Sequence, residues 1–140
     1  MKERSLAIVK PDAVRKGLAG KIIDRISSAG FTIVAMEQVY LTRNQAEGFY
    51  AVHKDKEFFK DLVEFMTSGP CIPMVVKKRN AIRGLRDLMG DTDPAKARMG
   101  TIRNEFGSSI QENVIHGSDS NETALKEIAF FFSAIEIPNR

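Results

Sequence analysis

The pattern of apolar and polar residues predicts a strand, a helix and a second strand in the first part of the chain. Leu6–Val9 is a short apolar run that ends at Lys10-Pro11-Asp12, which is typical of a buried strand that presents a lysine at the sheet's edge. Residues 17–29 place apolar side chains on one helical face, and Gly30 is the expected helix stop. Phe31–Tyr40 is a predicted strand with two apolar faces. Such a strand at an edge needs a second cover, which favours a subunit contact.

Helices and strands continue to alternate along the rest of the chain. Residues 43–67 are predicted to be helical in two pieces, residues 71–76 to form a strand, residues 80–88 a short helix and residues 90–100 a loop. A last strand–helix pair follows near residue 114. This order favours a single domain over residues 1–140, of the α/β (α+β) class: a ferredoxin-like βαββαβ sandwich with an antiparallel sheet and added helices.

The last strand–helix pair places one imidazole at a helix start. Val114 and Ile115 are β-branched and fit a short buried strand, and His116 follows them. Three good N-cap residues come next, and Asp119 with Glu122 makes a plausible capping box. The helix is expected to bury one face and to hold its N-terminal end near His116; its predicted buried residues are Leu125, Ile128, Ala129 and Phe132. A helix N-terminus attracts anions, so His116 could act on phosphate.

A packed or capping histidine is the alternative at this position, because a lone histidine near an apolar strand usually has no chemical role. The chain has 2 histidines, and His53 lies in the charged run 53–57, which predicts a solvated surface. Two histidines and no clustered cysteines also make a protein-ligated transition metal improbable. Cys71 is the single cysteine, so it is expected to be a small core residue.

Composition is that of an ordinary globular protein, with 43% hydrophobic and 28% charged residues. No apolar run is long enough to cross a membrane, and the first apolar stretch is too short for a signal peptide, so we expect a cytoplasmic protein. A net charge of +3 is too small to indicate nucleic acid.

Phosphate chemistry here cannot use the common glycine-rich loops. Residues 17–21 lack the spacing and the Ser or Thr of a Walker loop, and no dinucleotide or protein-kinase signature is present. Arginine forks suit phosphate oxygens, and Thr92 could donate a hydroxyl between them. A solvated basic surface is the equally plausible alternative. The arginines concerned are Arg79, Arg83, Arg86, Arg98 and Arg103.

Four separate stretches of the chain resemble nucleoside diphosphate kinases, in the same order and over essentially the whole length. They are Ala7-Ile8-Val9-Lys10-Pro11-Asp12-Ala13-Val14, Phe65-Met66-Thr67-Ser68-Gly69-Pro70, Gly100-Thr101-Ile102-Arg103 and Asn113-Val114-Ile115-His116-Gly117-Ser118-Asp119-Ser120. The resemblance implies a ferredoxin-like fold. It also implies Mg²⁺-assisted transfer of a γ-phosphate from a nucleoside triphosphate, chiefly ATP, to nucleoside diphosphates in two halves, through a phosphohistidine.

The same resemblance implies a role for each matching residue. His116 would be the nucleophile, Glu127 would accept a hydrogen bond from its other ring nitrogen, and Ser118 would hold that carboxylate. Mg²⁺ would be held mainly by the nucleotide phosphates, with no protein metal site. The implied nucleotide-binding residues are Arg86, Arg103 and Thr92 at the phosphates, Lys10 and Asn113 at the ribose 3′-hydroxyl, Tyr50 lining the site, and Phe58, Leu62 and Ile110 around the base.

Substrates implied by the resemblance are ATP, GTP, CTP, UTP, their deoxy forms and the corresponding diphosphates. The short tail ending at Arg140 resembles bacterial members, which are tetramers or hexamers. Departures from the family pattern occur at Lys77-Lys78, Met99 and Asn104-Glu105, where no chemistry is assigned. Two alternatives remain: a ferredoxin-like nucleotide- or nucleic-acid-binding module without catalysis, and a scaffold with a dead site. Aliphatic strands argue against nucleic acid, and retention of the whole residue set argues against a dead site.

Overall fold

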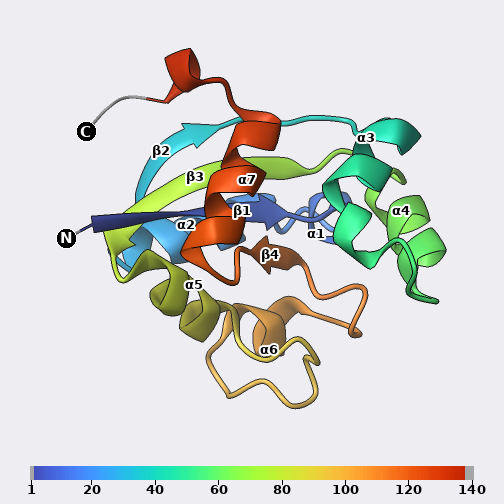
Figure 1. Ribbon diagram of the computed structural model, residues 1–140. Coiled ribbons are helices and arrows are strands. Elements are labelled where there is room, and N and C mark those ends of the chain that lie inside the picture. Colours follow the sequence, from blue (N-terminus) through green and yellow to red (C-terminus); the bar gives the residue numbers. More distant parts are fainter. Residues whose placement is uncertain (1, 138–140) are drawn as a thin grey trace.

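The sheet has 4 strands in the order β2-β3-β1-β4, all antiparallel to their neighbours, with helices on both faces (Figure 1). This arrangement, in a computed structural model that describes residues 2–137, confirms the predicted ferredoxin-like sandwich. The elements are β1 (Lys2–Val9), α1 (Pro11–Arg15), α2 (Ala19–Ser28), β2 (Thr32–Met36), α3 (Arg43–Phe49), η1 (Ala51–His53), α4 (Phe59–Met66), β3 (Ile72–Arg79), α5 (Ala81–Met89), α6 (Ile102–Phe106), β4 (Ile115–Gly117), α7 (Asn121–Phe131) and η2 (Ala134–Glu136). The tail ending at Arg140 lies outside the described residues.

The central strand β1 separates two hydrophobic cores. Ala7 and Val9 point to one face, where they pack with residues of α2 and α5. Leu6 and Ile8 point to the other face, which α3, α4 and α7 cover. This division follows from the period of two in a strand, since successive side chains leave on opposite faces. Cys71 is fully buried in the second core, as predicted.

Strand pairing brings the ends of β1 and β4 together. Ile8 lies opposite His116 and Val9 lies opposite Ile115. Lys10 follows β1 directly, and its backbone N–H donates to the Val114 carbonyl at 2.9 Å. The lysine and the histidine that the sequence singled out are therefore neighbours at one end of the sheet.

Two short α-helices, α1 and α6, and the 3-10 helix η2 were not predicted, and the strand expected over residues 31–40 is shorter than predicted. Pro11 begins α1, because its fixed φ suits the first helical position and its missing N–H is not needed there. Thr101 caps α6 by accepting from the Asn104 N–H. The strand expected over 31–40 is regular only over Thr32–Met36 and continues as one bridge between Val39 and Cys71. No helix within residues 2–137 is long and apolar enough to cross a membrane.

Helix α7 differs from its prediction at its cap and on its buried face. Its N-cap is Ser120, paired with Thr123, so the capping box predicted for Asp119 and Glu122 is wrong. Leu125 is 72% exposed. Asp119 is not the cap because its Oδ1 accepts from the Thr123 hydroxyl at 2.7 Å instead of from a backbone N–H of the helix. Ser118 is buried and already accepts the Leu6 N–H, which leaves Ser120 as the cap. The residues that α7 and its C-cap bury are Ala124, Ile128 and Phe132, whereas Ala129 is exposed.

Candidate active site

A cavity of about 460 Å³ opens where β1 and β4 end, between α4, α5 and the segment that follows α6. Every site residue named from the sequence lines this cavity except Ser118, which lies behind Glu127. Those that line it are Lys10, Tyr50, Phe58, Leu62, Arg86, Thr92, Arg103, Ile110, Asn113, His116 and Glu127. Residues from distant parts of the chain therefore meet on one surface.

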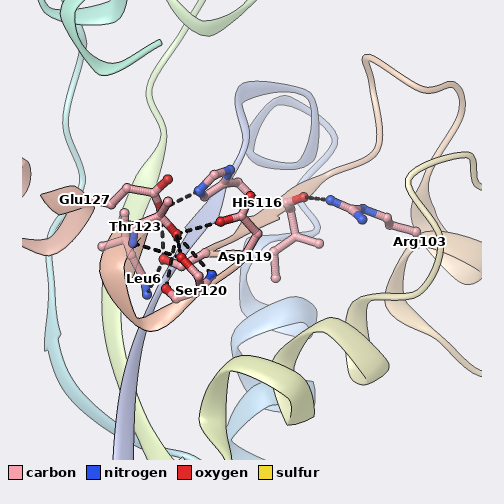
Figure 2. A network of polar contacts seen from close by, with 9 residues as sticks. Leu6, Arg103, His116, Asp119, Ser120, Thr123 and Glu127 are labelled. Carbon is pink, nitrogen blue, oxygen red and sulfur yellow. Dashed lines mark hydrogen bonds and ion pairs between the residues drawn. The ribbon is translucent and has the colours of Figure 1, made fainter. Parts of the chain in front are cut away.

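The His116 side chain is oriented by a carboxylate from α7. His116 Nε2 lies 2.8 Å from Glu127 Oε1, and Figure 2 shows the imidazole directed at this group. Ser118 Oγ donates to the same oxygen at 2.8 Å and itself accepts the Leu6 N–H at 3.2 Å. This chain of hydrogen bonds ties the carboxylate to β1.

Because an ionised carboxylate can only accept, the short contact assigns the proton to Nε2 in the neutral imidazole. The lone pair then lies on Nδ1, the ring nitrogen that Glu127 does not contact. The Phe49 ring meets the imidazole edge-on, with centroids 5.7 Å apart. His116 is thus held in one orientation with one nitrogen able to attack.

Lys10 and Asn113 form a buried polar pair beside the histidine. Lys10 Nζ donates to Asn113 Oδ1 at 2.7 Å. The Asn113 amide donates to the carbonyls of Thr92 at 2.9 Å and Ile110 at 2.8 Å. The pKa of the Lys10 ammonium is lowered to about 8, chiefly by burial and also by the charge of Arg103, while the charge of Asp12 opposes the shift. An anion in the cavity would relieve this unfavourable burial of charge.

Arg103 is buried and fixed by backbone carbonyls. Its Nη1 donates to Gly90 O at 3.0 Å, and its Nη2 donates to Ile115 O at 2.7 Å, a contact visible in Figure 2. Burial lowers the pKa of Arg103 to about 10, and the nearby charge of Arg86 acts in the same direction. Arg86 and Thr92 reach the cavity from exposed positions. Of the five arginines considered above, Arg86 and Arg103 line the cavity, whereas Arg79, Arg83 and Arg98 do not.

The cavity's outer end is apolar and open. Phe58 is 50% exposed and Ile110 is 60% exposed, and Leu62 also lines the cavity. His53 also lines this end, and its ring lies 5.4 Å from that of Phe58, centroid to centroid. His53 is half-buried at the cavity, where the sequence predicted a solvated surface position. His53 is part of the turn η1 at the cavity. The charged residues 53–57 gave no sequence signal that predicts this turn.

Tyr50 is buried under the same cavity, and its hydroxyl has no hydrogen-bond partner among residues 2–137. Burial raises the pKa of this phenol well above its ordinary value, and Cys71 and Glu127 act in the same direction. The hydroxyl therefore stays neutral. Phe49, which meets both the Tyr50 ring and the His116 ring, was not identified from the sequence.

Val114 does not belong to the strand, in contrast to the prediction. Its φ is +68°, and the Ile115 N–H donates to Asn113 O at 2.8 Å, which closes a three-residue turn with Val114 at its centre. Positive φ is rare for a β-branched residue, and such strain costs about 1–3 kcal/mol. The turn lies between two site residues, Asn113 and His116.

Known proteins resemble this chain over nearly its full length. The profile of a protein family described as "Nucleoside diphosphate kinase" matches residues 3–137. A nucleoside diphosphate kinase of Helicobacter hepaticus is 57% identical over 135 residues, which are 96% of this chain and 98% of that protein. One of Salinibacter ruber is 54% identical over 135 residues, 96% of this chain and 95% of that protein.

Solved structures show the same likeness. The Aquifex aeolicus nucleoside diphosphate kinase superposes with a TM-score of 0.96 at 45% identity, covering 99% of this chain and 100% of that chain. A halophilic nucleoside diphosphate kinase from Halobacterium salinarum, in complex with CDP, gives a TM-score of 0.95 at 40% identity, covering 100% of this chain and 93% of that chain.

Proposed function

The chain belongs to the nucleoside diphosphate kinase family, a family of nucleotide phosphotransferases, and we propose that His116 carries the phosphate between its two half-reactions. The observation that supports this most directly is the His116–Glu127 contact of 2.8 Å, which leaves Nδ1 as the nucleophile at the wall of the cavity. The donor would chiefly be ATP. Acceptors would be nucleoside diphosphates, including those of G, C and U and their deoxy forms.

In the first half-reaction, the Nδ1 lone pair attacks the γ-phosphorus of the triphosphate. An N–P bond forms, the bond to the β,γ-bridging oxygen breaks, and the nucleoside diphosphate leaves with that oxygen's electron pair. In the second half, a β-phosphate oxygen of another diphosphate attacks the same phosphorus and the N–P bond breaks. No proton has to move in either step if Nε2 keeps its proton.

Glu127 stabilises the positive charge that develops on the imidazole as Nδ1 bonds to phosphorus. Its carboxylate is already in place, since Ser118 Oγ and His116 Nε2 both lie 2.8 Å from Oε1. Such preorganised electrostatic contacts do not have to be rearranged during the reaction. Ser118 acts through Glu127 and has no access to the phosphate.

Positive and neutral polar groups that line the cavity would hold the phosphates and the sugar. Arg86, Arg103 and Thr92 fit the phosphate oxygens, and the Lys10–Asn113 pair fits the ribose 3′-hydroxyl. The Halobacterium salinarum relative was solved in complex with CDP, which supports nucleotide binding by this chain. The apolar group of Phe58, Leu62 and Ile110 would take the base.

Magnesium is the metal we propose, bound to the nucleotide rather than to a protein centre. Within residues 2–137, no group of three or more His, Cys, Asp and Glu side chains could hold a metal ion. Mg²⁺ is commonly held by substrate phosphates and water with few protein ligands, so it does not need such a group. When bound, Mg²⁺ would neutralise charge on the phosphate oxygens.

We also expect a homo-oligomer, a tetramer or a hexamer, acting in the cytoplasm. The edge strand β2 supports an assembly, because its outer side pairs with no other strand among the described residues and Met36 is 51% exposed on it. Sedimentation equilibrium would give the subunit number directly. A monomer at micromolar concentration would contradict this part of the proposal.

The central experiment follows the phosphate. The protein is mixed with γ-labelled ATP and Mg²⁺, freed of nucleotide, and tested for label that is lost in acid and kept in alkali. His116→Asn should retain no label, whereas the matched variant His53→Asn should still be labelled. Nucleotide binding without any label in the unmodified protein would instead support a binding module without catalysis.

A further inference from the structure

We propose that Asp12 is a positioning residue, whose buried carboxylate holds the strained turn at Val114 and, through that turn, the Asn113 side chain. This inference rests on the proposed function, because it assigns Asn113 to the nucleotide. Asp12 is absent from the cavity lining and is not one of the residues given a role above. It lies in the first turn of α1, two positions after Lys10.

The evidence begins with a buried contact between two distant segments. Asp12 is fully buried, and its Oδ2 accepts the backbone N–H of Val114 at 3.2 Å. Burial raises the pKa of this carboxyl, and the charges of Lys10 and Lys16 and nearby backbone N–H groups oppose the rise. A carboxylate is expensive to bury, so its position needs a reason beyond the short helix that contains it.

The turn is held from both sides by the same short segment. Asp12 receives the Val114 N–H, and the Lys10 N–H donates to the Val114 carbonyl at 2.9 Å. The two peptide groups that flank the Val114 Cα are thus fixed by residues 10 and 12. Val114 has no conformational preference for a φ of +68°, so these outside contacts have to hold it there.

The turn sets the direction in which the chain runs on either side of Val114. On one side is Asn113, whose side chain accepts from Lys10 Nζ at 2.7 Å. On the other side is Ile115, whose carbonyl accepts from Arg103 at 2.7 Å, followed directly by His116. If the Asp12 contact were lost, Val114 could relax toward a negative φ, and Asn113 would move away from the sugar.

A purely structural role for Asp12 is the competing explanation, and the two differ in what a substitution changes. A structural role affects stability alone. A positioning role affects the preference for nucleotides that carry a 3′-hydroxyl, because Asn113 would no longer reach that group. The preference is a ratio of rates in the same protein, so a smaller folded fraction does not change it.

The test compares two substitutions that keep the branching of the aspartate side chain at Cγ. Asp12→Asn keeps an oxygen that can accept the Val114 N–H, whereas Asp12→Leu keeps the shape and removes the acceptor. Isolated phosphoenzyme is mixed with ADP or with 3′-deoxy-ADP, and loss of label is followed in a single turnover. For Asp12→Leu we expect the rate with ADP to fall by about 10²-fold, the scale of a misplacement of about 1 Å, and the ADP to 3′-deoxy-ADP ratio to collapse toward one.

Asp12→Asn should keep most of the preference for ADP over 3′-deoxy-ADP, measured as the ratio of the two rates. Ile22→Val provides a stability control, since Ile22 is buried in α2 away from the cavity, and its ratio should equal that of the unmodified protein. If Asp12→Leu does not fold, Asp12→Ala takes its place in the same assay. An unchanged ratio in the variant without the acceptor overturns the inference. Failure of the unmodified protein to form a phosphoenzyme would overturn the proposed function instead, so the two failures are distinguishable.

Discussion

The two ends of the cavity differ in almost every physical respect. At the inner end, Lys10, Arg103 and Asn113 are at most 7% exposed and each makes hydrogen bonds at fixed distances. At the outer end, Phe58 and Ile110 are half exposed or more and offer only apolar surface. A polar, preorganised site strongly rejects a ligand that lacks a matching group, whereas an apolar slot discriminates weakly. The enzyme should therefore read sugar and phosphate strictly and the base loosely.

Removing the ribose 3′-hydroxyl should give the largest effect on the inner end. Lys10 Nζ and Asn113 Oδ1 lie 2.7 Å apart and would both bind this hydroxyl. Without it, both groups would lose a hydrogen-bond partner. Single-turnover phosphorylation should slow by roughly 10²-fold or more with 2′,3′-dideoxy-ATP, in line with the loss of a preorganised donor. With 2′-deoxy-ATP it should be nearly normal. Equal rates for ATP and both analogues would refute the placement of this pair at the sugar.

Glu127→Ala should slow phosphorylation by roughly 10²-fold, because it removes a preorganised contact and leaves the nucleophile. The matched variant Glu122→Ala changes an exposed carboxylate in the first turn of the same helix, and its rate should stay within about twofold of the unmodified protein, as is usual for surface substitutions. Rapid-quench measurement of the phosphoenzyme gives both rates. A loss as complete as that of His116→Asn would contradict the orienting role.

Nucleotide affinity should weaken as the pH rises through about 8, where the Lys10 ammonium of the free protein loses its proton. The pKa of Lys10 is lowered from 10.5 to about 8 on folding, so the unfolded chain binds more protons between these values. The contribution of Lys10 to the free energy of unfolding therefore rises between about pH 8 and pH 10.5, whereas nucleotide affinity falls over the same range. Calorimetry of ADP binding from pH 7 to about 9.5 tests this, and Lys10→Ala should remove the dependence near pH 8.

Substitutions at the outer end should give the smallest effect. The kcat/KM values for ATP, GTP, CTP and UTP should agree within about one to two orders of magnitude, the range of apolar-pocket selectivity. Phe58→Ala should lower all four values together, with little change in their ratios. A selective loss with one base would reveal a polar contact to that base that the described side chains do not explain.

The sequence predicted the sheet and the end of the sheet that carries the site, because both depend on strong local patterns. The apolar run before Lys10 marks the end of β1, Ile115 before His116 begins β4, and antiparallel pairing places these two points side by side. The partners of His116 came from the resemblance instead. Spacing alone does not show that Glu127 would reach back across a helix turn to the imidazole.

What the sequence could not show depended on contacts between distant segments. Residues 118–120 all suit a helix cap, and the hydrogen bond that Ser118 accepts from the distant Leu6 N–H removes Ser118 from the choice. The departures from the family pattern have the same kind of explanation. Lys78 donates to Ala29 O at 2.8 Å and lies over the Phe31 ring, and Glu105 forms a salt bridge with Arg25 at 2.7 Å. Nothing in the structure explains Met99, which is 94% exposed.

The position of β1 in the sheet also bears on how the protein is made. Of the four strands of this sheet it is synthesised first, yet its two neighbours in the sheet are β3 and β4, which are synthesised much later. Closing such long loops is slow, and it leaves strand edges exposed in the meantime. A nascent chain that has not yet produced β4 holds Lys10 without His116, so it should neither accept phosphate nor gain stability from nucleotide. Ligand can assist this protein only in the last step of its folding.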